Sequence, residues 1–400
     1  MRIAILSPYP TFPFQAELGF KTISYEDNAS WTVTLSDALA KMPDTEVHVV
    51  TEAINIPRSR TIQVNGVHVH FIKAPEQFKA LTLWQFDRRR LHRELATIQP
   101  DIVHGQGIEN QYGDAAVTST YPNLLTVHGI PRLSNQVQDL PKVSRAKVVE
   151  FASDRCLAVA RNIVIINPFI ADYLQLDPER YRLFRISNAV AAHFFEPCPE
   201  PRDTNLLLAI GWVDRLKAHD IFLRALALLK RRGVNARAVI IGPAPLRDYL
   251  ASLQSYVRAE RLDVEFTGFL PPGEVAEHLR RCTVLVHPSR HDNSPVSICE
   301  AMACGTPVVA ARVGGVSHMV RDGDTGLLFE SANAAELADK LEALLSDPAR
   351  QLQLATNARR YAKENYLPRV VAERTRAAYT AILNPSDQKA PSSCAALAAN

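Results

Sequence analysis

The chain has 400 residues, of which 47% are hydrophobic and 22% are charged, the composition of a folded globular protein with about two domains. Its 45 basic and 42 acidic residues leave a formal charge of +3, which argues against a dedicated nucleic-acid binder and against a disordered acidic protein. No apolar run approaches the roughly 18–20 residues that span a bilayer, and the stretch before Pro8 is too short for a signal-peptide core.

The first half of the chain alternates short apolar strands with helices. A hairpin is expected over 61–72, because Asn65-Gly66 favours a tight turn. Asn167 and Pro168 are expected to be the N-cap and the first residue of a helix. Strands are predicted at 3–6, 47–50, 101–104, 123–127 and 162–166, and helices at 29–42 and 81–98.

A second alternation of the same kind begins at residue 206. Strands are predicted at 206–210, 236–241, 264–267, 283–286 and 306–310, and helices at 220–231, 336–345, 350–364 and 370–383. Alternating strands and helices form parallel sheets with right-handed crossovers, so the fold class is α/β with two doubly wound halves. The Pro-rich stretch 196–201 is the expected linker, and a ligand is expected in the cleft between the halves.

The cysteines and the end of the chain carry weaker signals. The six cysteines show no metal-ligand spacing, and three lie in apolar stretches where a buried free thiol is common. A reducing compartment is the simplest interpretation, so we expect a cytoplasmic protein. The final stretch 386–400 is small, polar and alanine-rich, and disorder is expected there.

The segment 287–329 carries the strongest chemical signal. A loop with Asp292-Asn293 follows a predicted strand, and Ser294 and Pro295 suit the cap and first position of a helix that Gly305 ends. The N-terminus of such a helix presents N–H groups and a positive partial charge to the edge of the sheet.

Two carboxylates flank the start of this predicted helix. Asp292 precedes it and Glu300 lies within it, so together they could hydrogen-bond several hydroxyls of one polyol ligand. The spacing alone fits equally an Asp292 that assists the helix cap and a Glu300 that is exposed or paired.

The run that begins at Glu300, Glu-Ala-Met-Ala-Cys-Gly-Thr-Pro-Val-Val-Ala, resembles the C-terminal signature of glycosyltransferase family 4, the retaining GT-B enzymes. Gly314-Gly315 and Asp322-Gly323 with Gly326 also match, and Asp292 occupies the first acidic position of the signature. The resemblance covers most of the chain but is specific only in the second half.

The resemblance implies two Rossmann-like domains, an acceptor-side domain over 1–195 with a return helix at 370–384 and a nucleotide-sugar-binding domain over 203–368. It implies transfer of a sugar from a UDP- or GDP-sugar to a hydroxyl of a sugar or lipid-linked acceptor, with retention, in polysaccharide or glycolipid biosynthesis. Neither a metal nor another cofactor is expected. Asp322-Gly323-Asp324 is interpreted as a turn.

The same resemblance assigns roles to residues. Glu300 would bind the ribose hydroxyls and Asp292 the donor sugar, while Lys217 would stabilise the leaving diphosphate. The candidate catalytic residues are His128, Lys217 and Asp292. The candidate donor-binding residues are Gly211, Arg215, Lys217, Asn293, Ser294, Pro295, Val296 and Glu300.

Because the sequence departs from the family pattern at several positions, the resemblance does not identify the donor sugar. Pro295 has no N–H, so one backbone donor of the usual glycine-rich loop is missing. Trp212 replaces the usual arginine, which makes Arg215 the candidate second cation, and Ala218 replaces a glycine. The alternative is that Lys217 and Arg215 are solvated residues at the start of a helix.

Two features of the first half bear on the acceptor. His128 follows a predicted strand and resembles the histidine that faces the donor sugar, although a structural histidine would also fit; His104 is a weaker candidate. The region 25–31 lacks the glycine pair that the family places near the phosphates. Gly105-Gln106-Gly107 is only a fragment of a dinucleotide fingerprint.

The segment 77–95 combines aromatic and basic residues. It could lie on the inner face of an anionic membrane, or it could be a core-facing helix with a solvated basic side.

Three other functions remain open. The departures at Trp212 and Pro295 suit a catalytically weak GT-B binding or partner subunit. A nucleotide-sugar 2-epimerase shares the architecture, and so does a phosphorylase, although no lysine cluster resembles a pyridoxal-phosphate site.

Overall fold

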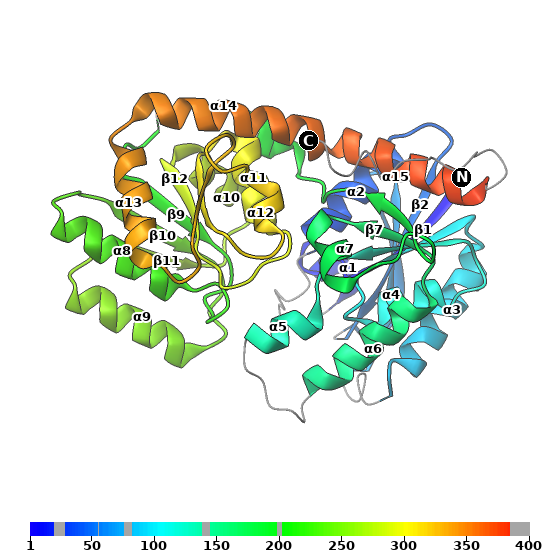
Figure 1. Cartoon of the computed structure of the whole chain (residues 1–400). Coiled ribbons are helices and arrows are strands. Elements are labelled where there is room, and N and C mark those ends of the chain that lie inside the picture. The colour runs from blue at the N-terminus through cyan, green and yellow to red at the C-terminus, as the bar shows by residue number, and fades with distance from the viewer. Residues whose placement is uncertain (20–28, 55, 76–81, 138–144, 198–201, 385–400) are drawn as a thin grey trace.

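The computed structural model describes residues 1–19, 29–54, 56–75, 82–137, 145–197 and 202–384. They form two α/β domains, each with a mostly parallel sheet between helices, which confirms the predicted fold class (Figure 1). The 386–400 tail, most of the Pro-rich linker, the start of the 77–95 segment and residues 25–28 lie outside the described residues.

The N-terminal domain contains an eight-stranded sheet with the order β3-β4-β2-β1-β5-β6-β7-β8. Its strands are β1 (Arg2–Leu6), β2 (Glu46–Ala53), β3 (Arg60–Val64), β4 (Val67–Lys73), β5 (Ile102–Gln106), β6 (Asn123–Val127), β7 (Asn162–Ile165) and β8 (Arg182–Arg185). Only β3 is antiparallel to its neighbour, and the predicted hairpin turn is confirmed by the positive φ angles of Asn65 (50°) and Gly66 (82°).

The C-terminal domain contains a six-stranded parallel sheet with the order β11-β10-β9-β12-β13-β14. Its strands are β9 (Leu206–Ile210), β10 (Arg237–Ile241), β11 (Val264–Gly268), β12 (Val284–His287), β13 (Val308–Ala311) and β14 (Leu327–Phe329). The order reverses next to β9, and a ligand is expected outside the carboxyl ends of strands at such a switch point.

Helices cover both faces of each sheet. The helices are α1 (Gln15–Leu18), α2 (Ser30–Ala40), α3 (Gln85–Ile98), α4 (Gln111–Val117), α5 (Pro131–Val137), α6 (Arg145–Val159), α7 (Pro168–Leu174), α8 (His219–Arg231), α9 (Arg247–Ala259), α10 (Pro272–Arg281), α11 (Val296–Cys304), α12 (Val316–Met319), α13 (Ala334–Leu345), α14 (Pro348–Asn365) and α15 (Pro368–Leu383), with the 3-10 turns η1 (Phe12–Phe14) and η2 (Ala192–Phe195).

Strand β1 shows why the central strands are apolar along their whole length. Ile3 and Ile5 pack against α2 and α15, whereas Ala4 and Leu6 pack on the opposite face against α3 and α4. A strand buried on both faces reads as a continuous apolar run rather than as an alternation.

The last two helices connect the domains. In Figure 1, α14 (orange) lies over the C-terminal domain and α15 (red) continues over the N-terminal domain. Val371, Ala372 and Tyr379 of α15 belong to the core of the N-terminal domain. At the junction, the Val190 N–H donates to the Tyr366 carbonyl at 2.9 Å, so the two passages of the chain between the domains lie side by side.

The start of α11 corrects one prediction. The helix begins at Val296, one residue later than predicted, with Pro295 in the N-cap position and no side-chain cap. Ser294 is therefore not the cap, because Pro295 itself is extended, with φ −63° and ψ 118°, and the helical turn starts only at the next residue. The predicted stop at Gly305 is confirmed, and its φ of 68° is left-handed.

No helix among the described residues is long and apolar enough to cross a bilayer.

Candidate functional site

The candidate site lies where strand ends of the two sheets face each other. Lys217 follows β9, Asp292 follows β12, His128 follows β6 and Asn167 follows β7. Carboxyl ends of neighbouring parallel strands meet at one edge of a sheet, which brings residues distant in sequence together.

Lys217 and Asp292 form the charged centre of the site. The Lys217 Nζ donates to Asp292 Oδ2 at 2.5 Å, and His287 Nε2 donates to the same oxygen at 3.1 Å. Burial alone would raise the pKa of Asp292, but the Lys217 charge and the His287 hydrogen bond outweigh it and hold this pKa well below its usual range. Asp292 is therefore ionised, and its Oδ1 makes no hydrogen bond with another described residue.

Two glycines allow the segment that leads from β9 to Lys217 to lie close to the end of β10. Gly211 has a φ of 150°, and a Cβ at Gly242 would collide with the Gly211 carbonyl. The Lys217 N–H donates to Asp214 Oδ1 at 2.8 Å, which fixes the turn before α8. Ala218, which replaces the family's glycine, has a left-handed φ of 54°. The sequence pattern thus marks a real conformational requirement at this position.

Arg215 lies elsewhere. Its guanidinium is 5.5 Å from the ring centre of Tyr249 on α9, and its carbonyl accepts a hydrogen bond from Arg290. The structure therefore places Arg215 against α9 rather than beside Asp292, and its role as a second cation stays a prediction. Trp212 is 44% exposed.

His128 is held in one orientation. Its Nε2 lies 2.7 Å from Gln106 Oε1, an oxygen that only accepts, so the Nε2 carries the proton. The ring of Trp31 packs against it at 5.0 Å. Burial lowers the pKa of His128 to about 4, which makes the imidazole neutral near pH 7.

A chain of hydrogen bonds continues from His128 to the last helix. Gln106 Nε2 lies 3.1 Å from His104 Nε2, and His104 Nδ1 lies 2.7 Å from the Tyr379 hydroxyl of α15. Burial lowers the pKa of His104 to about 3. His104 is thus a buried neutral residue that positions the groups behind His128.

The Asp292-Asn293 loop crosses to the other domain. Asn293 Nδ2 donates to the His128 carbonyl at 2.5 Å, and Asn167 Nδ2 donates to the Asn293 carbonyl at 2.6 Å. A Cβ at Gly315 would collide with the Asn293 carbonyl, so this approach requires glycine. The predicted N-cap position of Asn167 and the start of α7 at Pro168 are confirmed. The Asn167 side chain makes no cap hydrogen bond, because its amide donates to Asn293 of the other domain.

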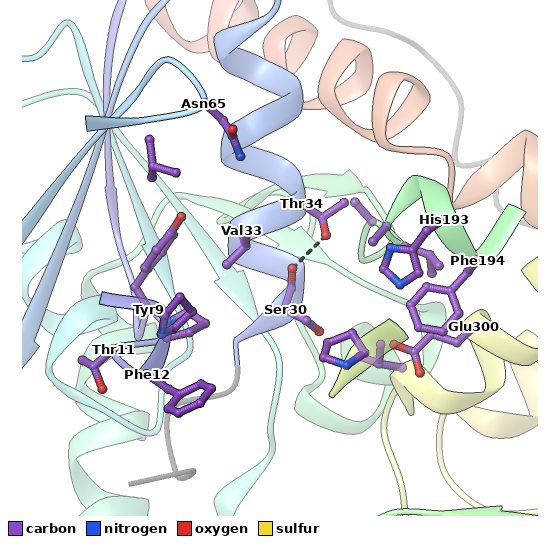
Figure 2. Close-up of a pocket in the computed structure, with 18 of the residues that line it drawn as sticks. Tyr9, Thr11, Phe12, Ser30, Val33, Thr34, Asn65, His193, Phe194 and Glu300 are labelled. Carbon is purple, nitrogen blue, oxygen red and sulfur yellow. Dashed lines mark hydrogen bonds between the residues drawn. The ribbon is translucent and has the colours of Figure 1, made fainter. Parts of the chain in front are cut away.

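Glu300 points into a cavity between the domains (Figure 2). It forms no ion pair or hydrogen bond with the other described residues, and burial raises the pKa of this carboxyl to about 7. Val296 lines the same cavity. Glu300 is therefore free to accept hydrogen bonds from a ligand, whereas Asp292 already has partners.

Sequence reasoning missed several site residues. In the sequence, Gln106 stands out only as part of a weak dinucleotide fragment, although it pairs in register with Thr126, two residues before His128. The ends of these two predicted strands, aligned as neighbours in a parallel sheet, indicate that Gln106 lies close to His128. Asn167 and Trp31 carry no such signal, because their contacts are made between distant segments.

The described residues contain no group of three His, Cys, Asp or Glu side chains that could hold a metal ion. Asp322 pairs with Arg312 at 2.7 Å, and Asp324 accepts from Asn357 at 2.8 Å. The two acidic residues of the Asp-Gly-Asp turn thus point to different partners.

Comparisons with known sequences find similarity in the second half of the chain. Residues 192–363 match the model of glycosyl transferases group 1. A D-inositol 3-phosphate glycosyltransferase from Arthrobacter sp. (strain FB24) is 40% identical over 148 residues, which cover 36% of this chain and 35% of that protein. The chain spans less than half the length of this relative and of seven other D-inositol 3-phosphate glycosyltransferases that it matches.

Solved structures align over nearly the whole chain. Sucrose-phosphate synthase from Thermosynechococcus elongatus aligns with a TM-score of 0.78 and 21% identity, covering 96% of this chain and all of that one. Anabaena HepE in complex with UDP-glucose aligns with a TM-score of 0.69 and 17% identity, covering 95% of this chain and all of that one. This molecule therefore has the GT-B fold, and its residues 192–363 match the model of glycosyl transferases group 1.

Proposed function

We propose that this protein is a retaining glycosyltransferase that moves a sugar from a UDP- or GDP-sugar to an acceptor hydroxyl, in polysaccharide or glycolipid synthesis. The observation that carries the proposal is the contact between Lys217 and Asp292. Asp292 lies on the loop whose next residue, Asn293, donates to the His128 carbonyl of the other domain. The complexes of Anabaena HepE with UDP and with UDP-glucose support a nucleotide-sugar donor.

The charged centre suits a diphosphate leaving group. Asp292 balances the charge of the Lys217 ammonium. When the bond between the anomeric carbon and the diphosphate breaks, negative charge develops on a phosphate oxygen, and a cation already fixed at that point stabilises it. Asp292 Oδ1 would accept a hydrogen bond from a hydroxyl of the donor sugar. The Glu300 carboxylate would accept hydrogen bonds from the ribose hydroxyls.

Retention follows from attack on the face that the leaving group vacates. The acceptor oxygen bonds to the anomeric carbon as the bond to the diphosphate breaks, and the hydroxyl proton passes to the leaving phosphate oxygen. Neutral His128 holds its Nε2 proton on Gln106, so its role is to orient the sugars rather than to take that proton. Closure of the domains excludes water and limits donor hydrolysis.

The first test is calorimetric titration with UDP, GDP and ADP. Micromolar binding of one nucleotide, weakened at least tenfold in Glu300→Ala and unchanged in Glu277→Ala, would fix the donor class; Glu277 is an exposed matched control on α10. Transfer assays with the matching sugar nucleotides follow. Lys217→Ala is expected to slow transfer about 10²–10³-fold, the usual effect of removing one such contact.

The same assays separate the alternatives. Turnover of the donor without an acceptor, with inversion at C2, would establish a nucleotide-sugar 2-epimerase. Absence of binding to all three nucleotides, by calorimetry and by thermal shift, would overturn the proposal and favour the catalytically weak partner subunit.

A further inference from the structure

Two loops carry the charged centre of the candidate site. The lysine loop, residues 211–218, joins β9 to α8 and holds Lys217, and the aspartate loop, residues 288–295, joins β12 to α11 and holds Asp292. The ion pair between Lys217 and Asp292 cannot by itself position the ammonium during transfer, because a diphosphate competes with the carboxylate for it. An additional contact is therefore needed to keep the two loops together.

Arg290 of the aspartate loop binds the lysine loop directly. Its backbone N–H donates to the Leu216 carbonyl at 2.8 Å, and its Nη1 donates to the Arg215 carbonyl at 2.6 Å. These carbonyls belong to the two residues that precede Lys217. The backbone and the side chain of one residue thus fix the two consecutive peptide groups that lead into Lys217.

Arg290 also binds the chain on the other side of Lys217. Its Nη1 and Nη2 donate to Asp220 Oδ1 and Oδ2, at 3.1 and 2.8 Å, and Asp220 lies in the first turn of α8. The Tyr249 hydroxyl of α9 donates to Asp220 Oδ1 at 2.9 Å. Burial alone would raise the pKa of Asp220, but the hydrogen bonds from Arg290 and Tyr249 outweigh it and lower this pKa. The ionised carboxylate and the planar guanidinium form a two-bond contact that sets an orientation as well as a distance.

The conformation of the lysine loop requires contacts from outside it. Ala218, its last residue, has a left-handed φ of 54°, which is unfavourable for a residue with a Cβ. Arg290 supplies hydrogen bonds on both sides of Lys217 that hold this conformation. Because Asp220 balances the charge of Arg290, the guanidinium contributes a fixed position rather than an unpaired positive charge.

We propose that Arg290 is a positioning residue: its contacts with the lysine loop and with Asp220 fix the Lys217 ammonium where the terminal phosphate of the leaving nucleoside diphosphate binds. The ammonium then keeps its place after the diphosphate has displaced Asp292 from it. The proposal rests on the proposed transferase function and adds to it a residue that acts through Lys217 and does not itself contact the diphosphate.

The test compares the Kd of the nucleoside diphosphate that calorimetry selects with the Kd of the matching monophosphate, which lacks the terminal phosphate. The preference for the diphosphate measures the contribution of a cation placed at that phosphate. Arg290→Met should reduce this preference about tenfold and leave the Kd of the monophosphate within about twofold of the wild type. Arg290→Lys should reduce the preference as well, because lysine keeps the charge but not the two parallel bonds to Asp220. Full preference in Arg290→Lys would show that charge alone matters and would overturn the proposal.

A double variant tests whether Arg290 acts through Lys217. Lys217→Met gives the preference that remains without the ammonium. In the Lys217→Met background, Arg290→Met should change the preference no further, because the group that it positions is already absent. Independent, additive reductions in the double variant would overturn the proposal.

Arg232→Met is the matched control. Arg232 pairs with Asp339 at 2.7 Å and with Glu342 at 2.8 Å at the other end of α8, so this variant removes a contact of the same kind without touching the lysine loop. Its preference for the diphosphate should stay within about twofold of the wild type. Equal reductions in Arg232→Met and Arg290→Met would assign the effect to a general loss of stability and overturn the proposal. Calorimetric unfolding shows that each variant folds, and Arg290→Lys carries the test by itself if Arg290→Met does not.

The wild-type protein separates this proposal from the proposed function. If it binds no nucleotide, the transferase function fails and the role of Arg290 fails with it. If it binds the monophosphate and the diphosphate equally, Lys217 does not contact the terminal phosphate, and the role of Arg290 is overturned. A preference for the diphosphate that is unchanged in both Arg290 variants would overturn the role of Arg290 alone and leave the transferase function intact.

Discussion

Asp292 and Glu300 are two carboxylates at the start of one helix that the structure gives opposite environments. The Lys217 ammonium keeps the pKa of Asp292 well below the usual range, whereas burial without a partner raises that of Glu300 to about 7. Asp292 is thus a permanent charge, and Glu300 changes its charge within the physiological range. One carboxylate can anchor a cation while the other adjusts to a ligand.

Glu300 makes folding stability depend on pH. A carboxyl whose pKa is raised in the folded state costs no stability below its usual value of 4.5 and reaches its full cost above about 7. Glu300→Gln removes this cost. We expect its Tm to match that of the wild type at pH 5 and to exceed it at pH 8, as measured by calorimetric unfolding of the nucleotide-free protein.

The exposed residue Glu277 provides the control for this pH effect. Glu277→Gln should show the same difference from the wild type at both pH values, because its carboxyl has no burial to relieve. Equal Tm differences for Glu300→Gln at pH 5 and pH 8 would contradict the assigned environment of Glu300.

At the scale of elements, a strand can be predicted from the sequence where its residues form an unbroken apolar run. Strands such as β6 and β9 were predicted with their observed limits, because a buried parallel strand is an unbroken apolar run. Strand β8 (Arg-Leu-Phe-Arg) lies at the sheet edge, and β14 has three residues, so neither carries that pattern. The motif residues Lys217 and Asp292 were found for their chemistry, but their contact spans 75 positions and is set by packing.

Helix α15 is joined to the N-terminal sheet through a buried polar contact. The Tyr379 hydroxyl meets His104 at 2.7 Å, and both side chains are buried. Tyr379→Phe leaves a ring nitrogen of His104 unpaired, which should lower the free energy of unfolding by about 1–3 kcal/mol. Urea denaturation followed by circular dichroism measures this loss.

A double mutant isolates the contact. His104→Phe combined with Tyr379→Phe removes both polar partners, so the double variant should lose less stability than the sum of the single variants. Additive losses would show that the hydroxyl and the imidazole do not depend on each other.

Helix α3 carries the described part of the segment considered for membrane contact. Leu91 and Leu95 face the core, and Arg88 and Arg90 pair with Asp114 and Glu52. Two of the basic residues of this helix therefore form ion pairs within the domain. The charge that remains exposed on this helix includes Arg89 and Arg93.

Membrane contact through α3 stays a prediction with a direct test. If it occurs, Arg89→Glu with Arg93→Glu should reduce cosedimentation with vesicles of anionic phosphatidylglycerol severalfold, since each basic residue near such a surface contributes about 1 kcal/mol. Arg247→Glu with Arg258→Glu on α9 is the control of equal charge change. Equal loss in both pairs would indicate nonspecific attraction.

At the scale of the whole molecule, hydrogen bonds from side-chain amides join the two domains. Asn293 of the C-terminal domain donates to His128, and Asn167 of the N-terminal domain donates to Asn293. These hydrogen bonds join the loop that carries Asp292 to the other wall of the cleft. They can form only in the closed arrangement, and closure is what excludes water during transfer.

Asn167→Ala should therefore loosen closure without disturbing the nucleotide contacts. We expect nucleotide affinity within about twofold of the wild type, a lower kcat for transfer, and a larger share of donor lost to hydrolysis. Asn162→Ala, which removes a hydrogen bond to Asn123 within one domain, is the control. An unchanged ratio of hydrolysis to transfer in Asn167→Ala would contradict this role.

The hydrogen bond between Val190 and Tyr366 constrains how the cleft can open. If one segment of chain joined the domains, they could twist and slide as well as bend relative to each other. Here the two connecting segments are hydrogen-bonded side by side and together form a hinge. The remaining freedom is rotation about the line they share. Substrate entry should then be a swing in which the Asn293 amide separates from His128, and a crosslink placed beside Val190 would leave that swing intact, whereas a crosslink between the two cleft walls would abolish it.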